Sequence, residues 1–278
     1  MDKIYILGLD GLEFNFVEAW NLKNIKQNEY SKIQVPITEE QNIPMSPEVW
    51  GSFLTGKIVS QSFSAISPPL KRISDFLSFT KKYTIGYEKL VNFLQKLIPD
   101  SLWKKRVTGY SPLENKTFLD ITNSKPINVL YYNEDPIIHL IFYYFSIGKI
   151  SLKKTVQLFM ALYKKYEKQI FNETKRFQDS YDLIFSYLHF PDILQHVLMF
   201  RPYEIKNHYL EIENFVSSLK NIIPESTLFL IISDHGFDLK RGTHSNHGFY
   251  SSNMPLNPKP KHITDFYNII IHLSNYKE

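Results

Sequence analysis

Aspartate and histidine side chains, which bind divalent metal ions, follow the apolar runs of this chain. The run Leu228–Ile232 leads into Ser233, Asp234, His235 and Gly236. A continuous apolar run of this length favours a parallel strand covered on both faces, and ligands bind at the carboxyl ends of such strands in open α/β sheets. We therefore interpret Asp234 and His235 as candidate metal ligands. In the alternative interpretation, Asp234 caps a following helix and His235 is a buried core residue.

Two more apolar runs lead to acidic residues. The run Ile4–Leu9 is followed by Asp10, and the run Tyr181–Leu188 is followed by a segment that contains Asp192 and His196. Asp192 and His196 are four positions apart, so a helix would place both on one face, within reach of a single ion. The sequence therefore predicts three strand ends that carry acidic residues.

The segment after His235 supplies further histidines. His244 and His247 lie in the short stretch Gly242–Gly248. Aspartate and histidine together suit Zn²⁺, and they also suit Mn²⁺ or Fe²⁺, because carboxylate and imidazole groups discriminate weakly among these ions. If these side chains converge in space, they form a metal centre.

A candidate nucleophile lies between the first and second of these strand ends. The segment Pro44–Gly56 contains Ser46 and ends in Thr55 and Gly56. It resembles the nucleophile turn of the alkaline phosphatase superfamily, in particular of the type I phosphodiesterase/nucleotide pyrophosphatase family, in which Ser or Thr precedes a helix that ends in Thr-Gly. The other motifs occur in the family's order, between residues 8 and 248: Gly-Leu-Asp-Gly, the nucleophile, Asp-x-x-x-His, Ser-Asp-His-Gly and Gly-Thr-His.

This resemblance implies a fold, a cofactor and a set of ligands. The implied fold is α/β, an alkaline-phosphatase-like three-layer sandwich with a mostly parallel central sheet and a mainly helical cap insertion. The implied cofactors are two divalent metal ions, Zn²⁺ first, with Mn²⁺ or Fe²⁺ as alternatives. By position in the motifs, one ion is held by Asp10, Ser46, Asp234 and His235, and the second by Asp192, His196 and His244.

The resemblance also implies a reaction. Two divalent ions about 3.5–4 Å apart would neutralise charge on a transferring phosphoryl group. Ser46 is the expected nucleophile, and we expect a covalent phosphoseryl or nucleotidyl-seryl intermediate. The expected function is hydrolysis of phosphodiester or pyrophosphate bonds, with nucleotide-type substrates favoured. A phosphomonoesterase or phosphomutase of the same superfamily is one alternative, and a non-catalytic metal-binding regulatory module is another.

Ser46 also has a structural interpretation. Serine followed by Pro47 and Glu48 is a typical helix start, with Ser46 at the cap position, Pro47 at the first helical position and an acidic residue in the first turn. The two interpretations are compatible, because the free N–H groups of a first helical turn also bind phosphate.

The chain departs from the family pattern after Gly56. Relatives usually continue to a His-Gly pair, and nucleotide pyrophosphatases carry a nearby Asn that helps to bind a phosphate oxygen, but no residue after Gly56 can be given that role. Lys57 is a candidate substrate-binding residue. His247 is interpreted either as a substrate-facing residue or as a partly buried turn histidine. His189 and His208 match no motif position, and we interpret them as structural or surface residues.

Length and composition favour one large domain. A chain of 278 residues with 43% hydrophobic content can bury one sizeable core, so we expect a single α/β domain over residues 1–278. Residues 67–149 lack the strand-and-acid pattern and are interpreted as an inserted cap or lid. Helices are expected at 87–98, 137–147, 151–178 and 261–271, and a strand at 126–132.

Charge and hydropathy limit the partners. No apolar run reaches the ~20 residues that cross a bilayer. The first strand begins by Lys3 or Ile4, which leaves no room for a signal peptide, so we expect a cytoplasmic protein without a membrane partner. Cysteine is absent, which excludes disulfides and thiolate ligands. A net charge of +4 is too slight to indicate a nucleic-acid partner. The expected partner is a small-molecule phosphoester substrate.

Overall fold

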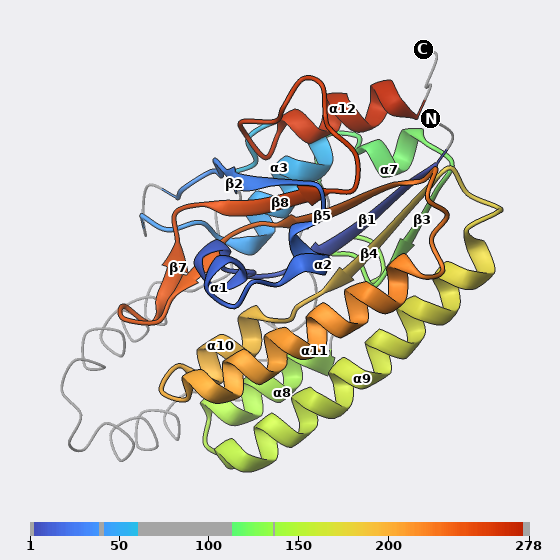
Figure 1. The fold of residues 1–278 in the computed structure, drawn as a ribbon. Coiled ribbons are helices and arrows are strands. Elements are labelled where there is room, and N and C mark those ends of the chain that lie inside the picture. Colours follow the sequence, from blue (N-terminus) through green and yellow to red (C-terminus); the bar gives the residue numbers. More distant parts are fainter. Residues whose placement is uncertain (1–2, 39–41, 61–112, 136, 275–278) are drawn as a thin grey trace. The chain divides into compact units, whose positions relative to one another are not determined.

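The computed structural model describes residues 3–38, 42–60, 113–135 and 137–274 (Figure 1). They form a mixed α/β fold with a six-stranded central sheet, which agrees with the predicted α/β class. Three of its strand pairings are parallel and two are antiparallel. The strands, in the order in which they lie in the sheet, are β2 (Glu29–Ile33), β8 (Gly248–Ser252), β5 (Leu228–Ser233), β1 (Ile4–Leu9), β4 (Leu183–Leu188) and β3 (Ser124–Ile127).

The three apolar runs of the sequence form neighbouring strands at the centre of this sheet. β1 pairs in parallel with β4 on one side and with β5 on the other, and every residue of the three strands is buried. The register sets Gly8 opposite both Tyr187 and Ile232. Because parallel strands end at the same edge, the residues that follow β1, β4 and β5 meet there.

A short hairpin extends from the end of β5. It consists of β6 (Gly236–Asp238) and β7 (Thr243–Ser245), which pair with each other in an antiparallel ladder. The chain then returns as β8, which runs antiparallel to both β5 and β2. No helix follows Asp234, because β6 begins at Gly236.

Helices connect the strands along the chain. Among the described helices, none is both long enough and apolar enough to cross a lipid bilayer. Their bounds are α1 (Phe14–Ala19), α2 (Lys23–Lys26), α3 (Ser46–Thr55), α7 (Phe118–Ile121), α8 (Ile137–Ser146), α9 (Leu152–Phe177), α10 (Asp192–Leu198), α11 (Pro202–Lys220) and α12 (Asp265–Leu273).

Aromatic side chains fix α3 against one face of the sheet. The ring of Trp50 packs edge-on against Tyr187 at 5.2 Å, and the ring of Phe53 against Phe185 at 5.7 Å. Burying a side chain such as Phe53 stabilises the fold by ~1.5–3 kcal/mol. α3 ends where Gly56 adopts a left-handed φ of 68°. α11 and the part of α9 from Ala161 onward lie on the opposite face (Figure 1).

The described residues fall into two compact units. One contains residues 3–38, 42–60, 113–134 and 161–274, and the other contains residues 135 and 137–160. The sheet and all residues discussed below as a candidate site belong to the first unit. The expected boundary of the inserted segment, 67–149, does not coincide with this division, because α7 and β3 belong to the sheet unit.

Most of the expected helices are present. The helix expected at 137–147 is α8, the one expected at 151–178 is α9, and the last one begins later than expected, at Asp265. The helix expected at 87–98 lies outside the described residues. The strand expected at 126–132 ends at Ile127, because Asn128 and Tyr131 adopt positive φ angles of 58° and 69°, which an extended strand does not allow.

Candidate metal centre

The carboxyl edge of the parallel strands gathers the predicted metal ligands. The ends of β1 and β5, the first residue of α3, helix α10 and strand β7 each contribute at least one side chain. The contacts below join all of them into one group, whose role in binding metal remains a prediction. We call this group the Asp-His cluster; its members are Asp10, Ser46, Asp192, His196, Asp234, His235 and His244.

One half of the cluster surrounds the Ser46 hydroxyl. Ser46 Oγ donates a hydrogen bond to Asp10 Oδ1 at 3.2 Å and lies 3.0 Å from His235 Nε2. His235 Nε2 is 3.4 Å from Asp10 Oδ1 and 3.3 Å from Asp234 Oδ2. One ligand atom from each of Asp10, Asp234 and His235 lies within 4.8 Å of the others, close enough for one cation to contact all three. We call these three residues and Ser46 the strand-end half.

The other half combines α10 with the hairpin. His244 Nε2 lies 3.1 Å from His196 Nε2 and 3.7 Å from Asp192 Oδ1, and His196 Nε2 is 3.4 Å from the same oxygen. The ring of His235 stacks on that of His244 with centroids 3.7 Å apart. Asp192, His235 and His244 also place one ligand atom each within 4.8 Å. We call Asp192, His196 and His244 the helix-hairpin half. His235 lies between the two halves.

Two imidazole rings are oriented as metal ligands are. His244 Nδ1 lies 2.8 Å from the carbonyl oxygen of Pro44, and His235 Nδ1 lies 3.0 Å from that of Gly236. A carbonyl only accepts, so Nδ1 carries the proton and Nε2 of the neutral ring turns its lone pair to the cluster. Burial and the neighbouring His244 lower the pKa of His235 to about 4, which keeps this ring neutral.

The carboxylates leave acceptors unsatisfied. Asp192 Oδ1 and Asp234 Oδ2 are buried and have no hydrogen-bond partner among the described residues. Burial raises the pKa of Asp234 well above its usual value, and repulsion from Asp10 raises it further; the same two causes raise the pKa of Asp192. Buried carboxylates that lie close together repel each other and destabilise the folded state unless a cation lies among them. The donor set and its orphaned oxygens therefore fit divalent metal ions.

A tight turn after β1 holds the strand-end half together. Gly11 adopts a left-handed φ of 71°, and a Cβ added to it would lie 2.6 Å from Asp192 Cβ. Its N–H donates to Asp234 Oδ1 at 3.2 Å, and Leu12 N donates to Ser233 Oγ at 2.8 Å. Only glycine allows both this backbone conformation and this close approach. The glycine of the Gly-Leu-Asp-Gly motif therefore positions two of the predicted ligands.

Glu13 connects this turn to the hairpin. Its Oε2 accepts hydrogen bonds from Phe237 N at 2.9 Å and from Ser245 Oγ at 2.8 Å, which are residues of β6 and β7. Its Oε1 lies 3.4 Å from His247 Nε2. His247 is thus placed at the base of the hairpin against a buried carboxylate. The sequence analysis did not identify Glu13, because an acidic residue two positions after a turn glycine has no distinctive pattern.

Asp10 has a second set of partners that the sequence did not indicate. Tyr187 OH donates to Asp10 Oδ2 at 2.5 Å, and His189 Nδ1 lies 3.7 Å from the same oxygen. His189 Nε2 lies 2.8 Å from Glu134 Oε1. Burial favours the neutral ring, but hydrogen bonds to Asp10 and Glu134 outweigh it and raise the pKa of His189 to about 9. Although burial opposes ionisation of Asp10, its histidine neighbours hold its pKa below the usual value.

Two structural interpretations of cluster residues are wrong. Met45, not Ser46, occupies the N-cap position of α3, and the Ser46 hydroxyl turns to Asp10 instead of capping the helix. Asp234 caps no helix, because β6 follows it. Pro47 is consequently the second residue of α3 and not the first, while Glu48 lies in the first turn, as expected.

Lys57 is not brought to the cluster. It follows the C-terminal end of α3, and a ten-residue α-helix is ~15 Å long, so Ser46 lies at the far end. Lys57 Nζ donates to Asn115 Oδ1 at 2.9 Å in an exposed position. Its predicted role in substrate binding has no support in this geometry.

Comparison with known proteins gives a fold and no family. No protein-family model matches the chain, and no curated protein matches it. Among solved structures, the chain is similar to the PH0037 protein from Pyrococcus horikoshii, with a TM-score of 0.51 and 9% sequence identity, over 100% of this chain and 99% of that chain. At this identity the similarity shows the α/β fold alone.

Proposed function

We propose that this protein is a metal-dependent phosphohydrolase that cleaves phosphodiester or pyrophosphate bonds, with nucleotide-type substrates favoured and Ser46 as nucleophile. One observation carries the proposal: Ser46 Oγ lies 3.0 Å from His235 Nε2 and 3.2 Å from Asp10 Oδ1, inside a cluster of buried carboxylates and imidazoles. A serine hydroxyl surrounded by metal-ligating groups is suited to phosphoryl transfer.

The two halves of the cluster would hold two divalent ions. Asp10, Ser46, Asp234 and His235 suit one ion, and His235 lies close enough to the helix-hairpin half to contact a second. When bound, such ions would act as Lewis acids that stabilise negative charge on the phosphoryl oxygens and favour the ionised form of the serine. The mixture of aspartate and histidine suits Zn²⁺ first, with Mn²⁺ or Fe²⁺ as alternatives.

The residues of the chain position the nucleophile and the phosphate. Ser46 is the first residue of α3, so the free N–H groups and the positive end of the helix dipole face an incoming phosphate. Asp10 and His235 fix the Ser46 oxygen, and Asp10 Oδ1 already accepts its proton in a hydrogen bond. The Ser46 hydroxyl gives up its proton, the Oγ–P bond forms as the bond from phosphorus to the leaving oxygen breaks, and the leaving oxygen takes up a proton from solvent. Water then attacks phosphorus, the Oγ–P bond breaks, and the serine regains a proton.

Metal content and turnover together test this proposal. We expect the purified protein to bind Zn²⁺ or Mn²⁺ and to hydrolyse bis-(para-nitrophenyl) phosphate faster than para-nitrophenyl phosphate. Ser46→Ala should lower kcat by ~10³-fold or more, because loss of a nucleophile removes the covalent route. Ser218, an exposed serine of α11 that donates to Asn214 O, gives the matched control Ser218→Ala, which should keep full activity.

Each other result points to an alternative. Faster turnover of the monoester would indicate a phosphomonoesterase. Phosphate exchange between positions of a sugar or glycerate phosphate, without release of free phosphate, would indicate a mutase. A protein that binds the cations and hydrolyses neither ester would be a metal-binding regulatory module. Full activity of Ser46→Ala on both esters would eliminate the covalent mechanism.

A further inference from the structure

We infer that Tyr187, His189 and Glu134 act as a chain of positioning residues that orients Asp10 within the metal centre. This inference rests on the proposed function, since orienting Asp10 matters only if its carboxylate binds a cation. All three residues lie outside the motifs that predicted the site. Tyr187 and His189 face Asp10 Oδ2, whereas Ser46 contacts Asp10 Oδ1, and Glu134 reaches His189.

Tyr187 determines which oxygen of Asp10 faces the cluster. Asp10 Oδ1 contacts Ser46 Oγ at 3.2 Å and His235 Nε2 at 3.4 Å, while Oδ2 accepts from Tyr187 OH at 2.5 Å. A carboxylate with one oxygen held by a short hydrogen bond cannot rotate about its Cβ–Cγ bond without losing that bond. A carboxylate oxygen only accepts, so the Tyr187 hydroxyl is the donor of this bond.

Packing holds the Tyr187 ring in place. Gly8 is its partner in the β1–β4 register, and a Cβ on Gly8 would lie 3.0 Å from the ring. The ring of Trp50 packs edge-on against it at 5.2 Å, and that of His189 does so at 4.7 Å. A hydroxyl on a ring confined in this way is a fixed donor, as the partners of metal-ligating carboxylates must be.

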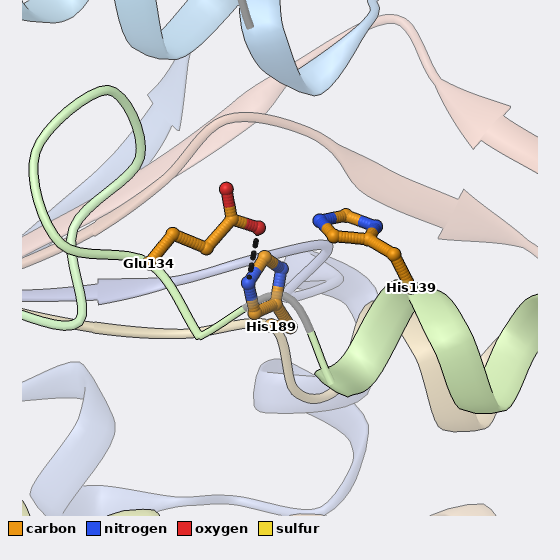
Figure 2. A group of neighbouring side chains, drawn as sticks. All are labelled: Glu134, His139 and His189. Atoms are coloured by element: carbon orange, nitrogen blue, oxygen red, sulfur yellow. Dashed lines mark ion pairs between the residues drawn. The ribbon is translucent and has the colours of Figure 1, made fainter. Parts of the chain in front are cut away.

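His189 and Glu134 extend the chain outward. His189 Nδ1 lies 3.4 Å from Tyr187 OH and 3.7 Å from Asp10 Oδ2, so this nitrogen faces the oxygen that Tyr187 holds. His189 Nε2 is 2.8 Å from Glu134 Oε1, and Figure 2 shows this carboxylate reaching the ring from the loop after β3. Glu134 thereby fixes the rotation of the imidazole, which in turn fixes the environment of Asp10 Oδ2.

A second buried histidine gives a contrast within the same chain. His208 and His189 are both 4% exposed. The rings of Tyr163 and Phe190 pack edge-on against His208 at 4.8 Å and 5.7 Å, and Glu211 Oε2 lies 4.0 Å from its Nδ1, beyond hydrogen-bond distance. His208 therefore packs mainly against aromatic rings, whereas His189 Nε2 lies 2.8 Å from Glu134 Oε1 and its Nδ1 faces the predicted metal ligand Asp10 at 3.7 Å.

Two pairs of matched substitutions in the full-length protein test the inference. Tyr187→Phe removes only the hydroxyl; its control is Tyr163→Phe, because the Tyr163 hydroxyl is buried without a hydrogen-bond partner among the described residues. His189→Gln is matched by His208→Gln. The affinity for Zn²⁺ is measured by calorimetric titration, the ligand geometry by the visible spectrum of the Co²⁺-substituted protein, and thermal unfolding is recorded for every variant.

We expect Tyr187→Phe and His189→Gln to weaken cation binding by ~10–100-fold, the usual effect of losing a partner of a metal ligand. The Co²⁺ spectrum should shift, and kcat should fall more than KM rises. The two controls should keep the wild-type affinity and spectrum even where they lower the melting temperature. Glu134→Gln keeps an acceptor for His189, so its loss of cation affinity and its shift of the Co²⁺ spectrum should be smaller. This variant serves as the test if His189→Gln fails to fold.

The outcomes separate this inference from the proposed function. If the wild-type protein binds no divalent cation, the proposed function and the inference both fail. If the wild type binds cations, and Tyr187→Phe and His189→Gln match their controls while Glu134→Gln matches the wild type in affinity and spectrum, the inference alone is overturned and these residues are structural.

Discussion

The two halves of the Asp-His cluster are built differently. In the strand-end half, Asp10, Asp234 and His235 are 4%, 0% and 0% exposed and follow strands whose register is fixed by the sheet. In the helix-hairpin half, the side chains of His196 and His244 are 29% and 11% exposed.

The helix-hairpin ligands lie on a seven-residue helix and a three-residue strand. Hydrogen bonds of the central sheet thus position the first half, whereas a short helix and a two-stranded hairpin outside that sheet position the second. We therefore expect substitutions in the two halves to change cation binding and stability in different ways.

The largest effect is expected at the strand-end half. Asp234→Asn removes a charge from a fully buried ligand without changing its shape, so we expect cation affinity to fall by more than the ~10–100-fold typical of an outer partner and turnover to be lost. In the presence of a chelator, the variant should be more stable than the wild type by ~1 kcal/mol or more, because the repulsion between Asp10 and Asp234 is relieved. Thermal unfolding with and without Zn²⁺ measures both effects.

A surface aspartate provides the control for this substitution. The side chain of Asp179 is 90% exposed and lies 3.8 Å from Lys3 Nζ, so Asp179→Asn should change stability by less than ~0.5 kcal/mol. Wild-type Zn²⁺ affinity in Asp234→Asn, together with lower stability in chelator, would contradict the assignment of Asp234 as a ligand.

The second-largest effect tests whether the turn at Gly11 positions ligands of both halves. Gly11→Ala places a methyl group against Asp192 and strains a left-handed backbone, so we expect a loss of ~2–4 kcal/mol in the free energy of unfolding. Because Gly11 also donates to Asp234, cation binding in both halves should weaken together. Gly148, which has a similar φ of 68° and lies in the other unit, provides the control for backbone strain alone. Binding that weakens equally in both glycine variants would indicate a general loss of stability.

The sequence predicts the strand-end half better than its supports. The apolar runs before Asp10 and Asp234 indicate buried parallel strands, and parallel strands must end together. The spacing of Asp192 and His196 indicates one helix face. Nothing in the local sequence distinguishes His189 from His208, because the difference lies in partners that are distant in the chain.

The misassigned cap has the same origin. The pattern around Ser46 fits a helix cap, but a tertiary contact with Asp10, 36 positions away, takes the hydroxyl instead. Local patterns therefore identify which groups reach the sheet edge, and long-range packing decides which atoms face each other.

The smallest effect is expected where the Glu13 side chain supports the β6–β7 hairpin. Glu13→Gln replaces one carboxylate oxygen by an NH₂ group, which donates and does not accept. The single remaining oxygen cannot serve both Phe237 N and Ser245 Oγ, which bind Oε2, and Asn15 N, which binds Oε1. The β6–β7 hairpin should loosen, so we expect ~10-fold weaker binding of the cation held by the helix-hairpin half and little change at the strand-end half. Stepwise Zn²⁺ titration resolves the two events if their affinities differ.

Glu213 offers a control of the same chemistry for Glu13→Gln. Its carboxylate accepts from Asn24 N at 2.8 Å and from Ile25 N at 3.0 Å, and these partners belong to α2 rather than to the cluster. Glu213→Gln should therefore lower the melting temperature without altering either Zn²⁺ affinity. If Glu13→Gln weakens both binding events equally, the hairpin and the sheet edge move as one body. The distinction between a half positioned by the central sheet and a half positioned by a short helix and hairpin would then be wrong.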